Sequence, residues 1–323
     1  MRKKTLLFIL GFLVAAAMAA PGSEGAPKST ETKFPAKQIT YMIPFDPGGQ
    51  SDREARRQQP LLEKALGQKV IIDYKVGGGG AVGWSQLVRA KPDGYYIMGI
   101  NLPHIILQPM QQECGYKTEQ IRPIVFFQST PLGIAVLKTS PYKTLRELVA
   151  AAKAKPGGVT VGGSGMFSGH HLATLRLQSL AGVKLNYVPF TGAAPQVMGF
   201  LGGHVVAVMA NSDDLVKFRD QMRVLGIADA QRFPALADAP TFKEAGFDMV
   251  EVIARGVGAP AATPESVVST LEAAFLQVAK NPAVVAALKR DGFVPMAMGA
   301  KESKEFIDKM TVVYKGQLKD IKK

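Results

Sequence analysis

The sequence has 323 residues, with 39 lysines and arginines against 26 aspartates and glutamates, and a formal net charge of +13 at pH 7. This length suits about two domains, and the basic residues are dispersed among acidic ones without long like-charged runs, which argues against nucleic-acid binding. Cys114 is the only cysteine, so an internal disulfide is excluded, and its position rules out a lipid anchor at the N-terminus.

The N-terminal segment has the pattern of an export signal. Three basic residues at positions 2–4 precede an uncharged run from Thr5 to Met18, and Ala17-Met18-Ala19 is a small-residue cleavage site. The run is shorter than the roughly 20 apolar residues that a spanning helix needs, and no later segment reaches that length. We therefore predict a signal peptide over residues 1–19, cleaved near Ala19, and a periplasmic protein without stable membrane insertion.

Residues 20–37 are rich in small, polar and charged side chains and are predicted to be an exposed N-terminal segment, so the fold starts near Gln38. Strand and helix patterns alternate from there. Strands are predicted over 39–44, 69–74 and 95–101, with helices over 52–66 and 81–89. Such alternation favours a parallel sheet covered by helices.

An apolar stretch from Ile124 to Leu137, interrupted at Gln128 to Pro131, predicts a strand that leaves one sheet and enters another. Helices then follow over 145–154, 168–181, 193–201, 264–278, 282–290 and 301–321, with strands over 158–163, 184–188, 205–210 and 222–228 and a return crossing over 251–258. We predict two α/β lobes joined by two crossings, with 38–126 and 252–323 in lobe 1 and 127–251 in lobe 2.

The segment from Ile39 to Arg53 predicts a strand, a loop and a helix. Gly48 and Gly49 allow the loop to take positive φ and approach a ligand closely, and Ser51 or Asp52 is suited to cap the helix. Unpaired N–H groups and the positive end of the helix would then face one small volume. This pattern predicts an anion site that needs no lysine or arginine.

Four loops at predicted strand ends lack lysine and arginine: residues 44–52, 77–83, 162–168 and 189–195. In α/β proteins ligands collect beyond the carboxyl ends of strands, and two facing lobes would bring these loops together. Backbone N–H groups, with Ser164, Ser168 and Thr191, would hold a small polar ligand from both sides. Closure of the two lobes about the crossings would exclude water. This arrangement predicts hinge-type ligand binding and implies no catalysis.

A series of short motifs then occurs in order along the chain: Phe34-Pro, Ile43-Pro-Phe with Pro47-Gly-Gly, Leu66-Gly-Gln, Pro92-Asp-Gly-Tyr95, Ser164-Gly with Ser168 and His171-Leu172, Val188-Pro-Phe with Gly192, and Ala259-Pro260 with Thr263-Pro264. With these motifs the chain closely resembles the Bug-type, or tripartite tricarboxylate transporter, periplasmic substrate-binding receptors. The resemblance extends from Phe34 to the C-terminus.

The resemblance implies a two-lobed type II periplasmic binding protein (Venus flytrap). It would capture a small organic carboxylate as a monomer, without cofactor or metal, and deliver it to an inner-membrane permease. Backbone N–H groups and ordered water of the loop from Phe45 to Asp52 would hold the carboxylate, while Ser164–Ser168 and Thr191–Ala193 close from the other lobe. The candidate ligand-binding residues are Phe45, Asp46, Gly48, Gly49, Gln50, Ser51, Asp52, Ala81, Trp84, Ser164, Met166, Ser168, Thr191, Gly192, Ala193 and Asp213.

Several candidates have two interpretations. Asp46 stands where the family usually has a small or apolar residue, so it disfavours citrate and favours a ligand with an amine or hydroxyl group, or else it points to solvent. Phe45, Trp84, Phe167 and Phe190 either line a pocket for an aromatic acid or belong to the core. Asp213, together with its neighbour at 214, either caps a helix or contacts the ligand across the cleft.

Other functions are also open. Gly78 to Gly83 reads G-x-G-x-x-G after a strand and before a helix, which suggests an NAD-binding oxidoreductase, but Asn101 occupies the place of the expected ribose-binding acid. His170 and His171 are adjacent, so they face different sides of a helix and do not form a metal pair. Ser164 lacks the last glycine of a nucleophile elbow. We predict no enzyme, and leave open a receptor that presents its ligand to a membrane sensor.

Overall fold

The computed structural model describes residues 34–321, so the predicted signal peptide and most of the exposed segment lie outside the described residues. Packing begins before the expected start at Gln38. The rings of Phe34 and Tyr95 meet edge to face at 5.0 Å, and the Ala36 N–H donates to the Tyr95 hydroxyl at 2.9 Å. These contacts fix the entry of the chain into the first strand.

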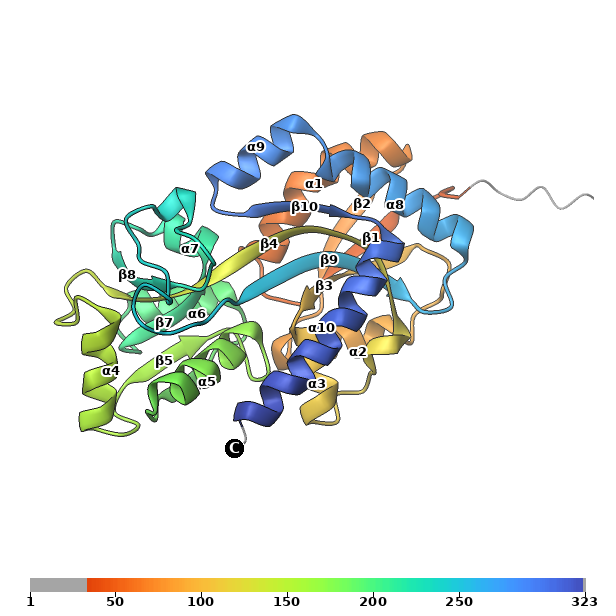
Figure 1. Cartoon of the computed structure of the whole chain (residues 1–323). Coiled ribbons are helices and arrows are strands. Elements are labelled where there is room, and N and C mark those ends of the chain that lie inside the picture. The colour runs from red at the N-terminus through yellow and green to blue at the C-terminus, as the bar shows by residue number, and fades with distance from the viewer. Residues whose placement is uncertain (1–33, 322–323) are drawn as a thin grey trace, which may run out of the picture. The chain divides into compact units, whose positions relative to one another are not determined.

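The first sheet contains both parallel and antiparallel strands. Its order is β2 (Val70–Tyr74), β1 (Ile39–Ile43), β3 (Tyr96–Leu102), β9 (Val252–Pro260), β4 (Ile121–Leu137) and β10 (Val294–Met298) (Figure 1). β1 is parallel to β2 and β3, whereas β9 is antiparallel to β3 and β4, and β10 is antiparallel to β4. The parallel pairing expected of the first three strands is confirmed, and the returning β9 and the outgoing β4 add an antiparallel part beside β3.

The second sheet shares β4 with the first. β4 pairs antiparallel with β7 (Ala207–Asn211) and β8 (Met222–Ile227), and β5 (Thr160–Gly163) is parallel to both β7 and β6 (Asn186–Pro189). The carboxyl ends of β5 and β7 thus lie at one edge of this sheet.

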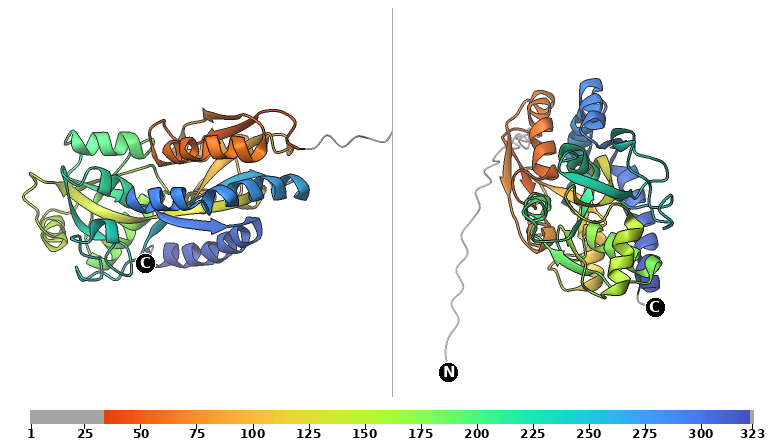
Figure 2. Two further views of the ribbon diagram at one scale, coloured as in Figure 1. Left: turned by 90° about the horizontal axis from the view of Figure 1, so that it is seen from above. Right: turned by 90° about the vertical axis from the view of Figure 1, so that its left-hand side faces the viewer.

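β4 is a single strand that runs through both sheets (Figures 1 and 2). It pairs with β9 through Pro131 and with β7 from Leu132 onward. The prediction of a strand that leaves one sheet and enters another is confirmed, and the polar side chains of Gln128 and Thr130, which interrupt its apolar pattern, are fully buried. Between residues 131 and 132, β4 changes from pairing with β9 to pairing with β7. The assignment of residues to two lobes stays a prediction.

Helices surround both sheets. Beside the first lie α1 (Gln50–Leu66), α2 (Ala81–Leu87), α3 (His104–Gln111), α8 (Glu265–Ala279), α9 (Pro282–Arg290) and α10 (Ala300–Ile321), and beside the second α4 (Leu145–Ala154), α5 (Gly169–Ala181), α6 (Ala193–Leu201) and α7 (Ser212–Lys217). Short 3₁₀ turns occupy Gly78–Gly80, Thr118–Gln120 and Pro234–Leu236. The sequence interpretation missed α3, α7 and β10. α3 and β10 contain a proline and α7 is only six residues long, so each gives a weak periodic signal.

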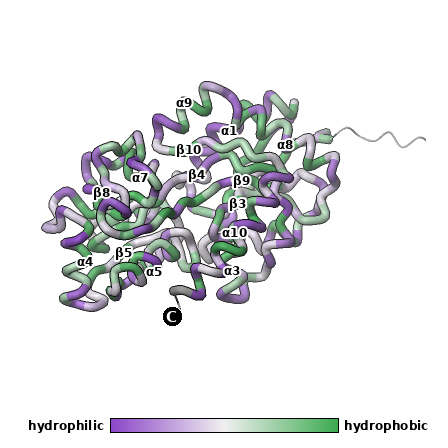
Figure 3. The backbone as a smooth tube through the Cα atoms, in the orientation of Figure 1, coloured by the Kyte–Doolittle hydropathy of each residue, from purple (hydrophilic) through white to green (hydrophobic). Residues whose placement is uncertain are grey.

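The helices bury one face and expose the other, and Figure 3 shows hydrophobic and hydrophilic stretches alternating along the outer helices. α8 buries Val268, Leu271, Phe275 and Val278, whose spacing places them on one face of the helix. Among residues 34–321, no single helix is long and apolar enough to cross a membrane. Taken together, α8 and α9, which are bent by 62°, pass that test on length and composition.

Candidate ligand-binding site

The loop between β1 and α1 places the N-terminus of α1 beyond the carboxyl end of β1. Gly48 has a φ of +79°, which favours glycine, but Gly49 has φ −74° and ψ 176°, so the expected positive φ at Gly49 is wrong. Gly49 is the N-cap and no side chain caps the helix. The N–H groups of Gln50, Ser51 and Asp52 belong to the first turn, where no carbonyl of the helix reaches them. We call these three groups the amide end of the site.

Asp52 stiffens this loop instead of capping the helix. Its carboxylate accepts hydrogen bonds from the Gly48 N–H at 2.7 Å, the Tyr74 hydroxyl at 2.6 Å and Arg56 Nε at 2.8 Å. Partial burial opposes ionisation, but these bonds and the Arg56 charge together hold the pKa of Asp52 below its usual value. The Gly48 N–H is therefore engaged within the loop, and the amide end begins at Gln50.

A cavity of about 20 Å³ lies at the amide end, between the two sheets. Its volume is enough for about one water molecule. The lining residues come from the first sheet and its loops (Phe45, Gly49, Gln50, Ser51, Asn101, His104, Ile253 and Arg255) and from the second (Ser164, Ala193 and Asn211). The structure thus brings together six of the residues that the sequence proposed: Phe45, Gly49, Gln50, Ser51, Ser164 and Ala193.

Other proposed residues lie elsewhere. Trp84 and Ala81 are buried, and Trp84 Nε1 donates to the Gly99 carbonyl at 2.9 Å while its ring meets Phe45 edge to face. Of the four aromatic residues considered for a pocket, only Phe45 lines the cavity. Met166 and Thr191 are exposed. Ser168 is fully buried and caps α5 by accepting from the His171 N–H at 3.2 Å.

Asp46 faces the opposite loop rather than open solvent. A Cβ placed on Gly192 would lie 3.1 Å from Asp46 Oδ2. That oxygen is buried and has no hydrogen-bond partner among residues 34–321. The carboxylate of Asp46 therefore sits at the contact between the two sheets' loops.

The glycine-rich turn forms part of the same contact. A Cβ on Gly165 would lie 3.2 Å from the Cα of Gly79, so these two backbones meet directly. The carbonyls of Gly78 and Gly79 accept from Gln108 Nε2 at 3.2 and 2.9 Å. Instead of a dinucleotide turn, the segment is a 3₁₀ turn engaged with α3 and with the loop after β5.

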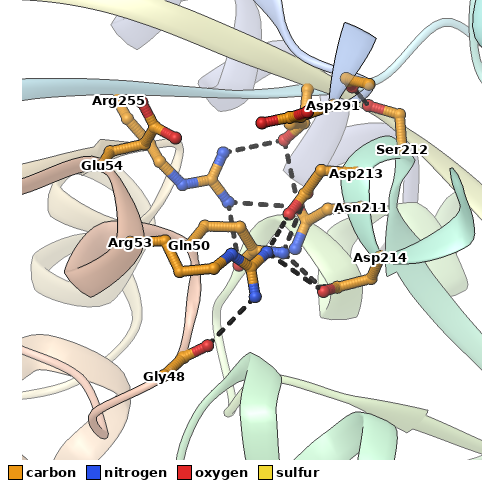
Figure 4. Close-up of polar contacts among 12 residues, drawn as sticks. Gly48, Gln50, Arg53, Glu54, Asn211, Ser212, Asp213, Asp214, Arg255 and Asp291 are labelled. Atoms are coloured by element: carbon orange, nitrogen blue, oxygen red, sulfur yellow. Dashed lines mark hydrogen bonds and ion pairs between the residues drawn. The ribbon is translucent and has the colours of Figure 1, made fainter. Parts of the chain in front are cut away.

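A network of polar side chains links α1 to α7 beneath the amide end (Figure 4). Gln50 Nε2 donates to Asp213 Oδ1 at 3.0 Å and also to Asp214 Oδ2, and Arg53 pairs with both carboxylates. Burial and the neighbouring charge of Asp213 raise the pKa of Asp214 to about 7. Asp213 is not a helix cap, since Asn211 is the N-cap of α7 and makes no side-chain capping bond.

Sequence reasoning missed five cavity residues: Asn101, His104, Asn211, Ile253 and Arg255. Arg255 contradicts the expectation of a site without cationic side chains, because it lines the cavity and is only 3% exposed. The available signal was an arginine inside the apolar run of β9, since arginine is almost never fully buried without a partner. Burial holds the pKa of His104 well below its usual value, so its imidazole is neutral.

His170 and His171 support the loop that carries Ser164. The Ser164 N–H donates to His170 Nδ1 at 3.1 Å, and the Phe167 N–H donates to His171 Nδ1 at 3.2 Å. Burial lowers the pKa of His170 to about 3 and that of His171 to about 4, so both rings are neutral acceptors. Among residues 34–321, no cluster of three or more histidine, cysteine, aspartate or glutamate side chains is arranged to hold a metal ion.

Comparison with known proteins gives one consistent result. The family model described as "Tripartite tricarboxylate transporter family receptor" matches residues 55–321. A UPF0065 protein of Pseudomonas sp. strain P51, from a tcbD-tcbE intergenic region, is 32% identical over 276 residues, which cover 83% of this chain and 81% of that protein.

Solved structures are also similar. A periplasmic transporter is 31% identical with a TM-score of 0.80, over 88% of this chain and 98% of its own. The R. palustris protein Rpa4515, whose structure contains adipate, is 24% identical with a TM-score of 0.85 over 89% and 98%, and it is evidence for the fold alone. The α/β periplasmic binding-protein fold expected from the sequence is confirmed.

Proposed function

Because the chain belongs to the receptor family of tripartite tricarboxylate transporters, which are periplasmic solute receptors and not enzymes, we propose that it binds a small organic carboxylate between its two lobes. The bound receptor then delivers its ligand to an inner-membrane permease. The proposed compartment is the periplasm, after cleavage of the signal peptide near Ala19.

The observation that carries this proposal is the amide end. Two of the three residues of the amide end, Gln50 and Ser51, line a cavity that both sheets enclose, and the positive end of a helix favours a carboxylate there. Gly49, Gln50 and Ser51 would contact the acid on one side, and Ser164 and Ala193 on the other. Adipate in the R. palustris protein is a carboxylate of the proposed kind.

Ligand entry requires the lobes to separate. The cavity of about 20 Å³ is far smaller than the roughly 300 Å³ or more of a typical small-molecule site. The contacts between Gly79 and Gly165, and between Gln50 and the acids of α7, join loops and helices of the two sheets. We therefore propose that these contacts form on closing, with β4 and β9 as the connecting strands.

A thermal-shift screen against organic acids tests the function. A ligand at a hundred times its Kd stabilises the folded protein by about 2.7 kcal/mol, which gives a readable rise in Tm. We expect carboxylates to raise Tm and matched alcohols, amines and sugars to leave it unchanged. Stabilisation by sugars or amines without any carboxylate would contradict the proposal.

A second output uses the same ligand site. The closed receptor presents its ligand to a membrane sensor instead of a permease, an alternative that the family and the site geometry do not separate. Affinity capture from membranes with and without the stabilising carboxylate distinguishes the two. Ligand-dependent recovery of a permease supports transport, and recovery of a sensor protein supports signalling.

A further inference from the structure

The cavity has one ionised side chain in its lining. The remaining lining residues are apolar or glycine, or carry neutral polar groups such as Asn101, Asn211, Ser164 and the uncharged imidazole of His104. Arg255 is the exception, and it reaches the cavity from β9, a different element from the helix α1 that forms the amide end.

The guanidinium of Arg255 is held by uncharged acceptors. It donates to Thr130 Oγ1 at 2.8 Å and Asn211 Oδ1 at 3.3 Å, and more weakly to the Ile253 carbonyl at 3.4 Å and Gln50 Oε1 at 3.5 Å. Its Nε is buried and has no partner among residues 34–321. A buried cation with loosely placed neutral acceptors and an unused donor is suited to take an anionic partner.

The nearby acids have other partners. Asp213 and Asp214 accept from Gln50 Nε2 and pair with Arg53, as Figure 4 shows. Glu54 and Asp291 pair with Arg57. Gln50 stands between the two groups, since its amide nitrogen donates to the acids and its oxygen accepts from Arg255. The acids therefore influence Arg255 through space without occupying its donors.

We propose that Arg255 is a specificity-determining residue that binds a second carboxylate of the ligand, distinct from the one held at the amide end. The preferred ligand is then a short linear dicarboxylate, with one acid at the first turn of α1 and the other at the guanidinium of Arg255. Thr130 and Asn211 fix the orientation of the guanidinium, and neutral His104 adds a hydrogen-bonding group without adding charge. This inference rests on the proposed function and names its ligand class.

Calorimetric titration with matched probes tests it. Linear diacids from succinate to suberate are compared with monoacids of the same carbon number, such as adipate with hexanoate. We expect the best diacid to bind at least tenfold more tightly than its monoacid, because only the diacid gains the charge-assisted bond to Arg255. Equal affinities for diacid and monoacid would overturn the inference while leaving the carboxylate function intact. If neither class binds, both proposals fail.

Variants at Arg255 locate the effect. Arg255→Met should reduce diacid affinity at least tenfold and leave monoacid affinity within about threefold, so that the preference disappears. Arg255→Lys keeps the charge but loses the planar fork, and it should retain part of the preference even if the Met variant fails to fold. Unchanged diacid binding in a folded Arg255→Met protein would exclude the role of Arg255.

Discussion

Two parts of the site are built in different ways. The amide end consists of backbone N–H groups from three consecutive residues of α1, held by a loop in which Gly48 and Asp52 bond to each other. The polar floor, as we call the group of Thr130, Asn211 and Arg255, consists of side chains on three different strands, of which Asn211 and Arg255 line the cavity.

This difference separates affinity from selectivity. Backbone amides fit any carboxylate and change little with sequence, whereas the polar floor depends on particular side chains and on the charges around them. The amide end would therefore serve the whole family of acids, and the floor would choose among them. Four changes test this division, in order of expected effect.

The largest effect concerns the charges next to the floor. Arg53→Gln leaves the buried acids Asp213 and Asp214 without their paired cation, so we expect a loss of about 3 kcal/mol in the free energy of unfolding. Arg56→Gln is the matched control, because Arg56 is exposed and its pair with Asp52 is worth about 1 kcal/mol or less. Chemical denaturation measures both, and equal losses would show that the acids are not stabilised by Arg53.

The amide end is tested by removing one N–H group. Gln50→Pro is compatible with the first helical position, since the preceding Gly49 is extended, and it differs from Gln50→Ala mainly in lacking the amide donor. We expect carboxylate affinity to be ten- to a hundredfold weaker in the proline variant than in the alanine variant, which corresponds to about 1.5–3 kcal/mol. Titration with the best acid from the screen provides the measurement. Equal affinities would mean that this N–H does not contact the ligand.

The protonation of Asp214 gives a smaller, pH-dependent effect. Its pKa in the folded protein is about 7, above the unfolded value, so this carboxyl stays protonated to higher pH in the folded state than in the unfolded state. The contribution of Asp214 to the free energy of unfolding therefore falls as pH rises from about 4 to about 7. Asp214→Asn keeps an acceptor for Gln50 but cannot ionise. We expect the variant to be about 1.4 kcal/mol more stable relative to wild type at pH 8 than at pH 6. A constant difference across this range, measured by denaturation at each pH, would contradict the assignment.

The smallest effect concerns the loop before the amide end. Gly48→Ala forces a side chain into a φ of +79° without any nearby atom to clash, so the expected loss is about 1 kcal/mol of backbone strain alone. Gly48→Asn should recover part of that loss, because asparagine tolerates this region better. The Tm values of wild type, Gly48→Ala and Gly48→Asn measure these losses. A larger loss in the Asn variant than in the Ala variant would show that backbone strain is not the cause.

The sequence allowed the amide end to be predicted because its residues are contiguous. Gly48 to Asp52 follow an apolar strand and open a helix, and this local order is visible without any tertiary information. Helices α4, α6 and α9 were predicted to the residue for the same reason, since their periodicity is local. The error at Gly49 arose because glycine is compatible with both signs of φ, so its presence alone does not fix the conformation.

The polar floor could not be predicted in this way. Thr130, Asn211 and Arg255 lie far apart in sequence, and only the pairing of β4 with both β9 and β7 brings them together. The same pairing explains one polar residue in the apolar run of β4: the hydroxyl of Thr130 contacts Asn211 of β7 and accepts from Arg255 of β9. Asp213 looked like a cap because its charge partner, Arg53, is supplied by a helix 160 residues earlier.

The contact between Gly79 and Gly165 bears on how far the proposed closure proceeds. Because two backbones meet there without side chains, a methyl group on Gly165 would lie 3.2 Å from the Cα of Gly79 and hold the two loops further apart. The room left for a ligand would then depend on this backbone contact as well as on the residues that line the cavity.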